Sequence, residues 1–313
     1  MLEIIPSVLP ILLLIGFGFF MHKKEIIGKS TADGLKKLAI DIGLPALLFI
    51  SFMDMELKIE YLSLTIILFL FFCALFLIGI GLVKIKGLSI PSLPYLIPGF
   101  AVATLGIPLY LSLFGLENLS QYTILSVGHE IFFWFVLIAM LQMKQSGKGF
   151  SLQMVMDVIK NPFIIAVILG LILNITGLNI VLGENFIYKG IENFLEYLGN
   201  LVTPLILIVI GYDLKLDKRY IKDSFRILVI RIPLILILGY MVKILLLDRI
   251  LTPDPYFDYA WFTYLILPPP FAMSLFIGRY STEDNRNIAT NTTVLATIIS
   301  IIIYIIFALV IST

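Results

Sequence analysis

Long apolar runs separated by short polar connections fill the chain from end to end. A membrane-spanning helix needs about 20 mostly apolar residues, and ten stretches of the sequence meet that length. They cover residues 4–22, 34–54, 61–83, 93–114, 120–142, 155–175, 191–212, 224–247, 257–279 and 287–312. The connections leave no room for a soluble domain, so the pattern predicts an all-α membrane protein with ten transmembrane helices.

Composition agrees with this pattern. Apolar residues make up 60% of the chain and charged residues 14%, and the mean hydropathy is +1.05, all typical of a protein that lives in a bilayer. The net charge of +1 gives no indication of nucleic-acid binding. The first run lacks a basic start and a small-residue cleavage site, so it is predicted to be a retained span. Cys73 is the single cysteine, which excludes a disulfide within the chain.

Positive charges predict how the spans are oriented. Most of the 22 Lys and Arg residues lie in the connections that follow the odd-numbered spans, and the opposite connections hold Lys58, Lys189 and Arg249. The side of a membrane protein that is rich in Lys and Arg faces the cytoplasm. The pattern therefore predicts a multi-pass protein of the cell membrane with both termini outside the cytoplasm.

Two parts of the chain share a pattern of polar residues and prolines at nearly constant spacing. The matched pairs are Pro45 with Pro204, Asp41 with Asn200, Asp54 with Asp213 and, in a second pair of segments, Pro108 with Pro270. A unit with an odd number of spans reverses its orientation when it is repeated. We therefore predict two inverted five-helix repeats, residues 1–150 and 151–313, an arrangement typical of secondary transporters.

Prolines interrupt the fourth and ninth predicted spans. The ninth contains Pro268, Pro269 and Pro270 in a row, and the fourth contains Pro98, Gly99, Gly106 and Pro108. A proline removes a backbone donor and clashes with the preceding turn. Broken backbone inside a membrane is tolerated where protein or a water-filled cavity satisfies it. Two crossed, interrupted helices that form a substrate site are one interpretation, and two ordinary proline kinks are the other.

Five motifs together resemble the auxin efflux carrier family, which includes the plant PIN-like carriers and prokaryotic permeases. They are "GLPALLF" (43–49), "GIPLYLSLFG" (106–115), "KNPFIIAVILGLIL" (160–173), "TPLILIVIGYDL" (203–214) and "ATIIS" (296–300). The resemblance implies a scaffold of helices 1, 2, 6 and 7, often dimeric, and a transport domain of helices 3–5 and 8–10. It also implies elevator-type alternating access for a small organic anion, and a homodimer.

The sequence departs from the family pattern at the interrupted helices. Many members have an Asn where this chain has Ala101, and often an Asn where it has Met273 and Ser274. These amides are expected to contact substrate, so the departure argues against an aromatic auxin. The candidate substrate-binding residues are Thr104, Gly106, Pro108, Pro268, Pro269, Pro270, Met273, Ser274, Asp41 and Asn200.

Glu130 is the sharpest ionisable candidate within a span. A charged side chain inside a membrane is costly and is a functional hypothesis by default. Burial disfavours the charged form of a carboxyl group, so Glu130 is a candidate for exchanging a coupling proton or binding sodium. A protonated structural carboxyl is the alternative. Adjacent helical residues point in different directions, so Ser126 shares the face of Glu130 better than His129 does, and His129 is expected to be buried and hydrogen-bonded rather than a ligand.

Several other polar residues inside the spans have two possible interpretations. Asp41 and Asn200 either line the pathway or satisfy carbonyls freed by the prolines that follow them. Arg231 lies about 10 Å into its helix and either counters an anion or Glu130, or snorkels to the cytoplasmic interface. Lys243 is expected to snorkel.

The last span carries a polar stripe. Thr290, Thr293, Thr297 and Ser300 share one helical face, with Asn287 and Asn291 beside it. Interhelical hydrogen bonding is the expected role, and Asn291 is also a candidate to coordinate an ion with Glu130.

The competing functions are an intramembrane enzyme, a cation-coupled carrier or sodium/proton antiporter, and a channel or sensor. "GHEIFFW" lacks the second histidine of a zinc HExxH site, since the other histidine is His22. Asp213 in "GYDL" has no partner Gly-x-Gly-Asp motif of an aspartyl protease. We therefore predict a transporter, not an enzyme, with no cofactor and no metal site. Its partners are a small organic anion, a coupling proton or sodium ion, and the lipid bilayer.

Overall fold

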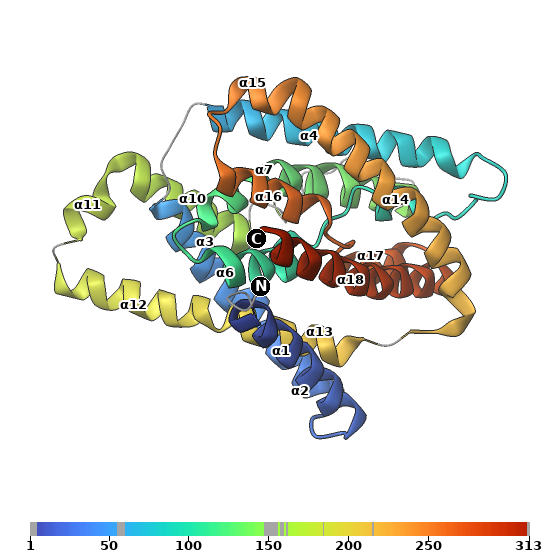
Figure 1. Ribbon diagram of the computed structural model, residues 1–313, viewed down its shortest axis with the longest axis horizontal. Coiled ribbons are helices and arrows are strands. Elements are labelled where there is room, and N and C mark those ends of the chain that lie inside the picture. Colours follow the sequence, from blue (N-terminus) through green and yellow to red (C-terminus); the bar gives the residue numbers. More distant parts are fainter. Residues whose placement is uncertain are drawn as a thin grey trace.

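The computed structural model describes residues 5–54, 60–146, 156, 160, 162–183, 185–214 and 216–311. Within those residues the secondary structure is helical throughout, with no strand. Figure 1 shows long helices that cross one another at many angles around a central region where shorter helices meet. The predicted all-α class is confirmed.

The helices have the following bounds. They are α1 (Ile5–Lys23), α2 (Lys29–Leu38), η1 (Ala39–Gly43), α3 (Leu44–Met53), α4 (Glu60–Val83), α5 (Leu93–Leu96), η2 (Val102–Gly106), α6 (Ile107–Phe114), α7 (Leu119–Phe132), η3 (Phe133–Ile138), α8 (Ala139–Ser146), α10 (Pro162–Thr176), α11 (Leu178–Leu182), α12 (Phe186–Asn200), α13 (Val202–Asp213), η4 (Lys218–Tyr220), α14 (Ile221–Val242), η5 (Lys243–Leu247), α15 (Asp248–Ile250), α16 (Pro255–Leu265), α17 (Phe271–Tyr280) and α18 (Glu283–Ile311).

Five of these helices or continuous helix pairs are long and apolar enough to cross a membrane, judged by length and composition. They are Glu60–Val83, Leu119–Leu141, Phe186–Asp213, Lys218–Ile250 and Glu283–Ile311. They match the third, fifth, seventh, eighth and tenth predicted spans. The other predicted spans are also helical but are shorter or interrupted, and residues 155, 157–159 and 161 of the sixth lie outside the described part. The total of ten spans and the inverted repeat stay predictions.

Two prolines follow a local widening of the helix. The π-helical turn η1 precedes Leu44 and Pro45, and η2 precedes Ile107 and Pro108. A π-turn shifts the hydrogen-bonding register by one residue. It therefore accommodates a proline, which lacks the N–H and crowds the preceding turn. Pro45 and Pro108 consequently sit in the first turn of a new α-helix and do not break the chain's helical path.

Glycines allow several helix pairs to approach closely. A Cβ at Gly18 of α1 would collide with the Ile208 carbonyl of α13, and one at Gly211 of α13 would collide with the Ile15 carbonyl of α1. Gly170 of α10 lies in the same way against Phe49 of α3. Small residues at helix interfaces are the usual means of tight packing in membranes.

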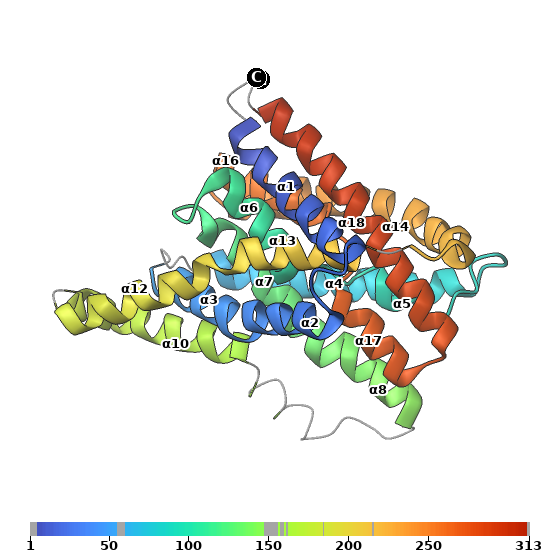
Figure 2. The same cartoon turned by 90° about the horizontal axis from the view of Figure 1, so that it is seen from below.

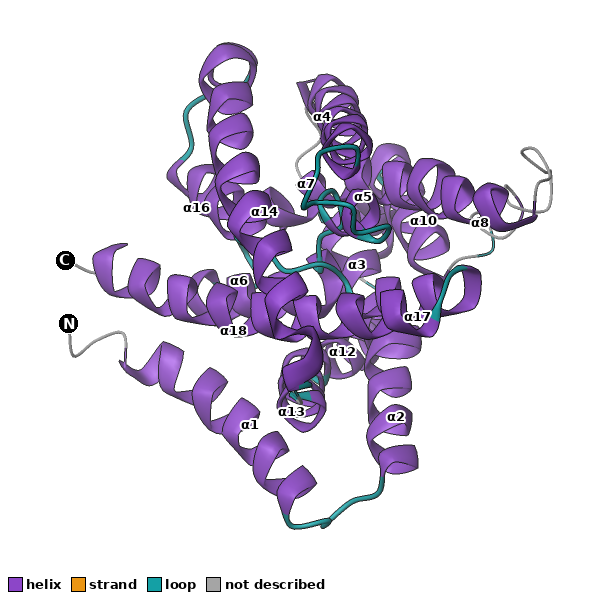
Figure 3. Cartoon of the chain, turned by 90° about the vertical axis from the view of Figure 1, so that its right-hand side faces the viewer, coloured by secondary structure: helices purple, strands orange, loops and turns teal. Residues whose placement is uncertain are grey.

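The helices pack in two sets. In one set α1 lies on α13, α3 lies on α10 and α12, and α13 also contacts α2. In the other set α4 packs on α5 and α7, α16 packs on α7, and α18 packs on α14 and α17. Figure 2 shows α3, α10 and α12 on one side of the molecule, with α14, α17 and α18 on the other. The start of α1 and the end of α18 lie at the same end (Figure 3).

Two predicted spans contain a non-helical break. Residues 97–101, here called the first break, separate α5 from η2, and residues 266–270, the second break, separate α16 from α17. The second break holds all three consecutive prolines, which are buried. The interpretation that prolines interrupt the ninth predicted span is confirmed. In the fourth, the interruption lies at Pro98 and Gly99.

Candidate functional site

The two breaks meet inside the protein. The Ala101 N–H donates a hydrogen bond of 2.8 Å to the Pro268 carbonyl. At Gly99 an added Cβ would lie 3.0 Å from Cδ of Pro270, so the two breaks pack closely against each other there. Backbone released from two helices is thus partly satisfied by the opposite break, as membrane burial requires.

Arg231 of α14 binds both breaks at once. Its guanidinium donates from Nε to the Leu96 carbonyl (2.9 Å), from Nη2 to the Gly99 carbonyl (2.7 Å) and from Nη1 to the Leu267 carbonyl (2.8 Å). The side chain is only 2% exposed, and its Cζ lies 5.0 Å from the centre of the Phe100 ring, a cation–π distance. The snorkelling interpretation for Arg231 is wrong, because the carbonyls freed by the breaks offer the guanidinium a closer set of acceptors than the membrane surface.

His129 and Glu130 adjoin the first break from α7. The Phe100 N–H donates to Nε2 of His129 over 3.2 Å, and His129 is 1% exposed. The expected buried, hydrogen-bonded histidine is confirmed. Nδ1 of His129 lies 3.5 Å from Oε1 of Glu130. The two neighbours therefore approach each other more closely than their directions on an ideal helix indicate.

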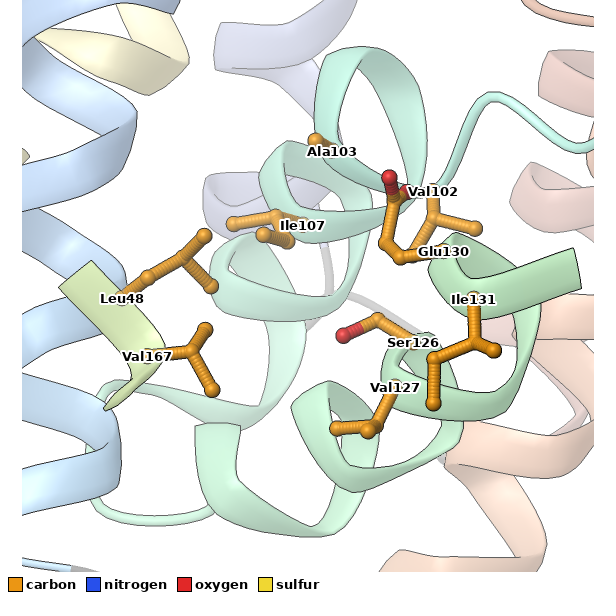
Figure 4. Close-up of a pocket in the computed structure, with 9 residues that line it drawn as sticks. All are labelled: Leu48, Val102, Ala103, Ile107, Ser126, Val127, Glu130, Ile131 and Val167. Atoms are coloured by element: carbon orange, nitrogen blue, oxygen red, sulfur yellow. The ribbon is translucent and has the colours of Figure 1, made fainter. Parts of the chain in front are cut away.

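Glu130 lines a cavity of about 50 Å³ next to the first break. The lining residues are Leu48, Val102, Ala103, Ile107, Ser126, Val127, Glu130, Ile131 and Val167. Figure 4 shows Leu48 and Val167 across the cavity from Glu130 and Ile131, with the Glu130 carboxyl group directed toward the turn at Val102 and Ala103. Ser126 shares this cavity, as its spacing from Glu130 predicts. The cavity is mostly apolar and has one ionisable group among its lining residues.

The predicted residues of the fourth span surround the same turn. Thr104 lies on η2, and its hydroxyl is buried with no hydrogen-bond partner among the described residues. It lines a second, smaller cavity of about 10 Å³ that also contains Lys36 and Asp213, whose charged groups are 3.5 Å apart. A Cβ at Gly106 would collide with the Tyr122 hydroxyl, so only glycine fits there.

Other predicted residues lie at differing distances from this region. Met273 and Ser274 are buried in α17, three and four residues beyond the second break. Asp41 on η1 and Asn200 at the end of α12 are exposed and line neither cavity. The structure therefore does not bring Asp41 and Asn200 to the Glu130 cavity.

The polar stripe of α18 has several separate partners. Asn291 accepts a 2.9 Å hydrogen bond from the Asp217 N–H and donates to Ser224, so its amide connects α18 to the segment before α14. The Ser300 hydroxyl is placed to donate to the Ile266 carbonyl of the second break, an interhelical bond of the kind expected, and to the Ala296 carbonyl of its own helix. Thr290 and Thr297 instead donate within their own helix. Lys243 pairs with Asp248 at 2.6 Å and with Asp258 at 2.9 Å.

Sequence reasoning missed the tyrosines around the breaks. Tyr122 donates to the Val102 carbonyl (3.2 Å), and Tyr304 donates to the Leu109 carbonyl (2.6 Å). The Tyr264 hydroxyl is buried without a hydrogen-bond partner among the described residues. Their polar tips in the middle of apolar spans were a usable signal, since a buried tyrosine hydroxyl usually finds a partner. In the described part of the chain, no group of three or more His, Cys, Asp or Glu side chains could hold a metal ion.

These features define a helical membrane protein of the transporter class, with broken helices around a buried polar centre. Comparison with known proteins supplies the family. Residues 3–253 match the family described as "Membrane transport protein", and the chain belongs to this family, the auxin efflux carrier family that its motifs resemble. A similar protein is an uncharacterized transporter of Methanocaldococcus jannaschii, 28% identical over 216 residues, which cover 66% of this chain and 68% of that protein.

Proposed function

We propose that this protein is a secondary transporter of a small organic anion and that the substrate binds beside the first break. The observation that carries the proposal is the meeting of the two breaks next to the cavity of Glu130. Interrupted helices in both halves of a transporter mark the substrate site, because their free backbone groups can bind a ligand. Val102 and Ala103, which directly follow the first break, and Ile107 at the start of α6 line this cavity.

Arg231 supports an anionic substrate. A guanidinium keeps its charge in proteins, and this one is buried at the junction of the breaks. The three carbonyls that accept its hydrogen bonds are neutral, so they solvate the positive charge without cancelling it. Arg231 also donates to the backbone near Ala101, where many family members carry an amide. We infer that Arg231 attracts the substrate anion in place of the amide side chains that this protein lacks.

The packing supports an elevator-like movement. The cavity is lined on one side by Leu48 of α3 and Val167 of α10, and on the other by residues of η2, α6 and α7. These belong to the two sets of helices that the family resemblance names scaffold and transport domain. Relative sliding of the two sets would carry the first break past α3 and α10. Asp41 and Asn200 lie exposed on the scaffold set, which is compatible with a face covered by a second copy in a homodimer.

Glu130 supports a second candidate, a proton- or sodium-coupled cation carrier. A carboxylate in an apolar cavity attracts a cation and repels an anion. Under this alternative Arg231 is purely structural, and its role is to donate three of its five N–H groups to the backbone carbonyls of the breaks. The two candidates differ in what evokes transport: a carboxylate in the first, a sodium or pH gradient alone in the second.

Solid-supported-membrane electrophysiology on purified protein in liposomes tests both candidates. Small carboxylates, auxins and sodium would be applied at several pH values to the parent, Glu130→Gln and Pro269→Ala. Pro269→Ala places an unpaired N–H in the buried second break, whereas the control Pro233→Ala changes an exposed proline inside α14. We expect carboxylate-evoked currents that Pro269→Ala abolishes and Pro233→Ala retains. Currents evoked only by sodium or a pH step would reject the organic anion and favour the cation carrier.

A further inference from the structure

The hydrogen bond between Phe100 and His129 determines where the histidine carries its proton. The Phe100 N–H is a donor, so Nε2 of His129 must offer a lone pair across the 3.2 Å separation. A neutral imidazole has one bare nitrogen and one protonated nitrogen. The proton of His129 therefore resides on Nδ1, the nitrogen that faces Glu130.

Among the described residues, the neighbours of His129 are mostly aromatic rings, which carry no charge that could balance a protonated imidazole. Phe72 of α4 and Phe133 of η3 contribute uncharged rings, and Tyr264 of α16 contributes a ring 6.4 Å away. On the first break, the Phe100 ring contacts the His129 ring and also makes the cation–π contact with the Arg231 guanidinium. Nδ1 has no hydrogen bond among the described residues, and the Glu130 carboxyl lies 3.5 Å from it.

Charge balance links this pair to the proposed substrate. With Glu130 ionised and His129 neutral, the pair carries one negative charge beside the cavity, and an organic anion in that cavity would be repelled. One added proton makes the pair neutral, whichever of the two side chains holds it. Anion binding and proton uptake by the pair therefore favour each other, as linked equilibria must.

We propose that His129 is a proton-controlled latch on the first break. A proton from water in the cavity binds Nε2 and makes the ring an imidazolium, stabilised by the carboxylate on its Nδ1 side. Nε2 then becomes a donor, so the Phe100 N–H loses its acceptor and the hydrogen bond between α7 and the break is lost. Proton uptake is thereby converted into release of the segment that borders the cavity. The inference rests on the proposed transport function and adds its coupling step.

Histidine NMR tests the latch independently of transport. The chain has two histidines, and His22 lies at the exposed end of α1, so His22→Gln leaves His129 as the single reporter. In ¹⁵N-histidine-labelled protein at alkaline pH, where the imidazole is neutral, we expect a protonated Nδ1 and a bare Nε2. Acidification should protonate Nε2 and shift the amide resonance of Phe100 in the same pH range. The opposite tautomer would overturn the proposal, and so would a Phe100 amide resonance that does not shift when His129 is protonated.

Transport by matched variants tests the coupling. In His129→Gln the amide oxygen can reach the position of Nε2 and accept from Phe100 but cannot take up a proton, whereas His129→Leu has no acceptor. We expect His129→Gln to transport near neutral pH with a pH dependence flattened at least about threefold, and His129→Leu to lose transport at every pH. An unchanged pH profile in His129→Gln would refute the coupling. If no substrate is transported even by the parent, the proposed function fails, while the NMR result still decides the tautomer and the latch.

Discussion

The two breaks satisfy their backbone by opposite means. In the second, the three prolines have no N–H, and the N–H groups of Ile266 and Leu267 bond to carbonyls of the preceding helix. Its carbonyls accept from Ala101, Arg231 and Ser300. The first retains N–H groups at Phe100 and Ala101, and these need acceptors from elsewhere in the protein. One of those acceptors is a histidine next to a carboxyl group.

This difference separates a fixed element from a responsive one. The geometry of the second break is largely set by its own residues, because proline restricts its backbone and cannot donate. The first break depends on hydrogen bonds with His129 of α7 and Arg231 of α14, and under the proposed latch the first of these responds to charge. Under that proposal a proton acts on the first break, while the second serves as its rigid partner.

Removing Arg231 should have the largest effect on both breaks. Arg231→Gln leaves at least one of three buried carbonyls without a donor and removes the buried charge, so we expect a loss of at least about 3 kcal/mol in unfolding free energy, together with loss of transport. Thermal unfolding in detergent and flux in liposomes measure the two effects. Arg226→Gln is the control, since this exposed arginine of the same helix pairs with Asp223 at the surface. Equal effects of the two substitutions would contradict the conclusion that Arg231 holds the two breaks together.

Separating the breaks by a single methyl group should have an intermediate effect. In Gly99→Ala the new Cβ would lie 3.0 Å from Pro270 Cδ and 3.3 Å from the Tyr95 carbonyl, so the two breaks must shift apart at a cost of about 1–3 kcal/mol. We expect a lower melting temperature and slower transport. Gly81→Ala on α4, where nothing lies within 4 Å of the added Cβ, should lower neither, because alanine is a better helix former than glycine.

Loss of one hydroxyl at the second break should have the smallest effect. Ser300→Ala removes the donor to the Ile266 carbonyl and should cost about 1 kcal/mol, with no change in the pH dependence of transport. Thr290→Ala loses only a bond within its own helix and serves as the control. A pH profile altered by Ser300→Ala would show that the second break is also responsive, which would remove the contrast between the two.

The sequence predicted the helical class, the five long spans and the proline interruption of the ninth span, because these follow from local apolar length and from the chemistry of proline. It also grouped Glu130 and Ser126 correctly, since their spacing on one helix places them on one face. Both predictions depend only on residues that are close together in the sequence.

The partners of Arg231 could not be predicted in the same way. Its acceptors at Leu96, Gly99 and Leu267 are distant in sequence, and the rotation of α14 that directs the side chain inward depends on packing with other helices. The same holds for His129, whose acceptor role exists only because the first break brings the Phe100 N–H to its ring. For Pro108 the sequence predicted an interruption that the structure does not show. The π-turn η2 accommodates this proline without breaking the helix, and the non-helical break lies at Pro98 instead.

Cysteine accessibility beside the first break tests the central claim most directly. In a Cys73→Ser background, which removes the single native cysteine, Ala103→Cys places a thiol in the wall of the Glu130 cavity. Thr282→Cys, at an exposed position before α18, is the control. The account predicts that a carboxylate which evokes transport currents slows labelling of Cys at position 103 by a water-soluble thiol reagent and leaves position 282 unaffected. Equal labelling at position 103 with and without that carboxylate would contradict a substrate site at the first break.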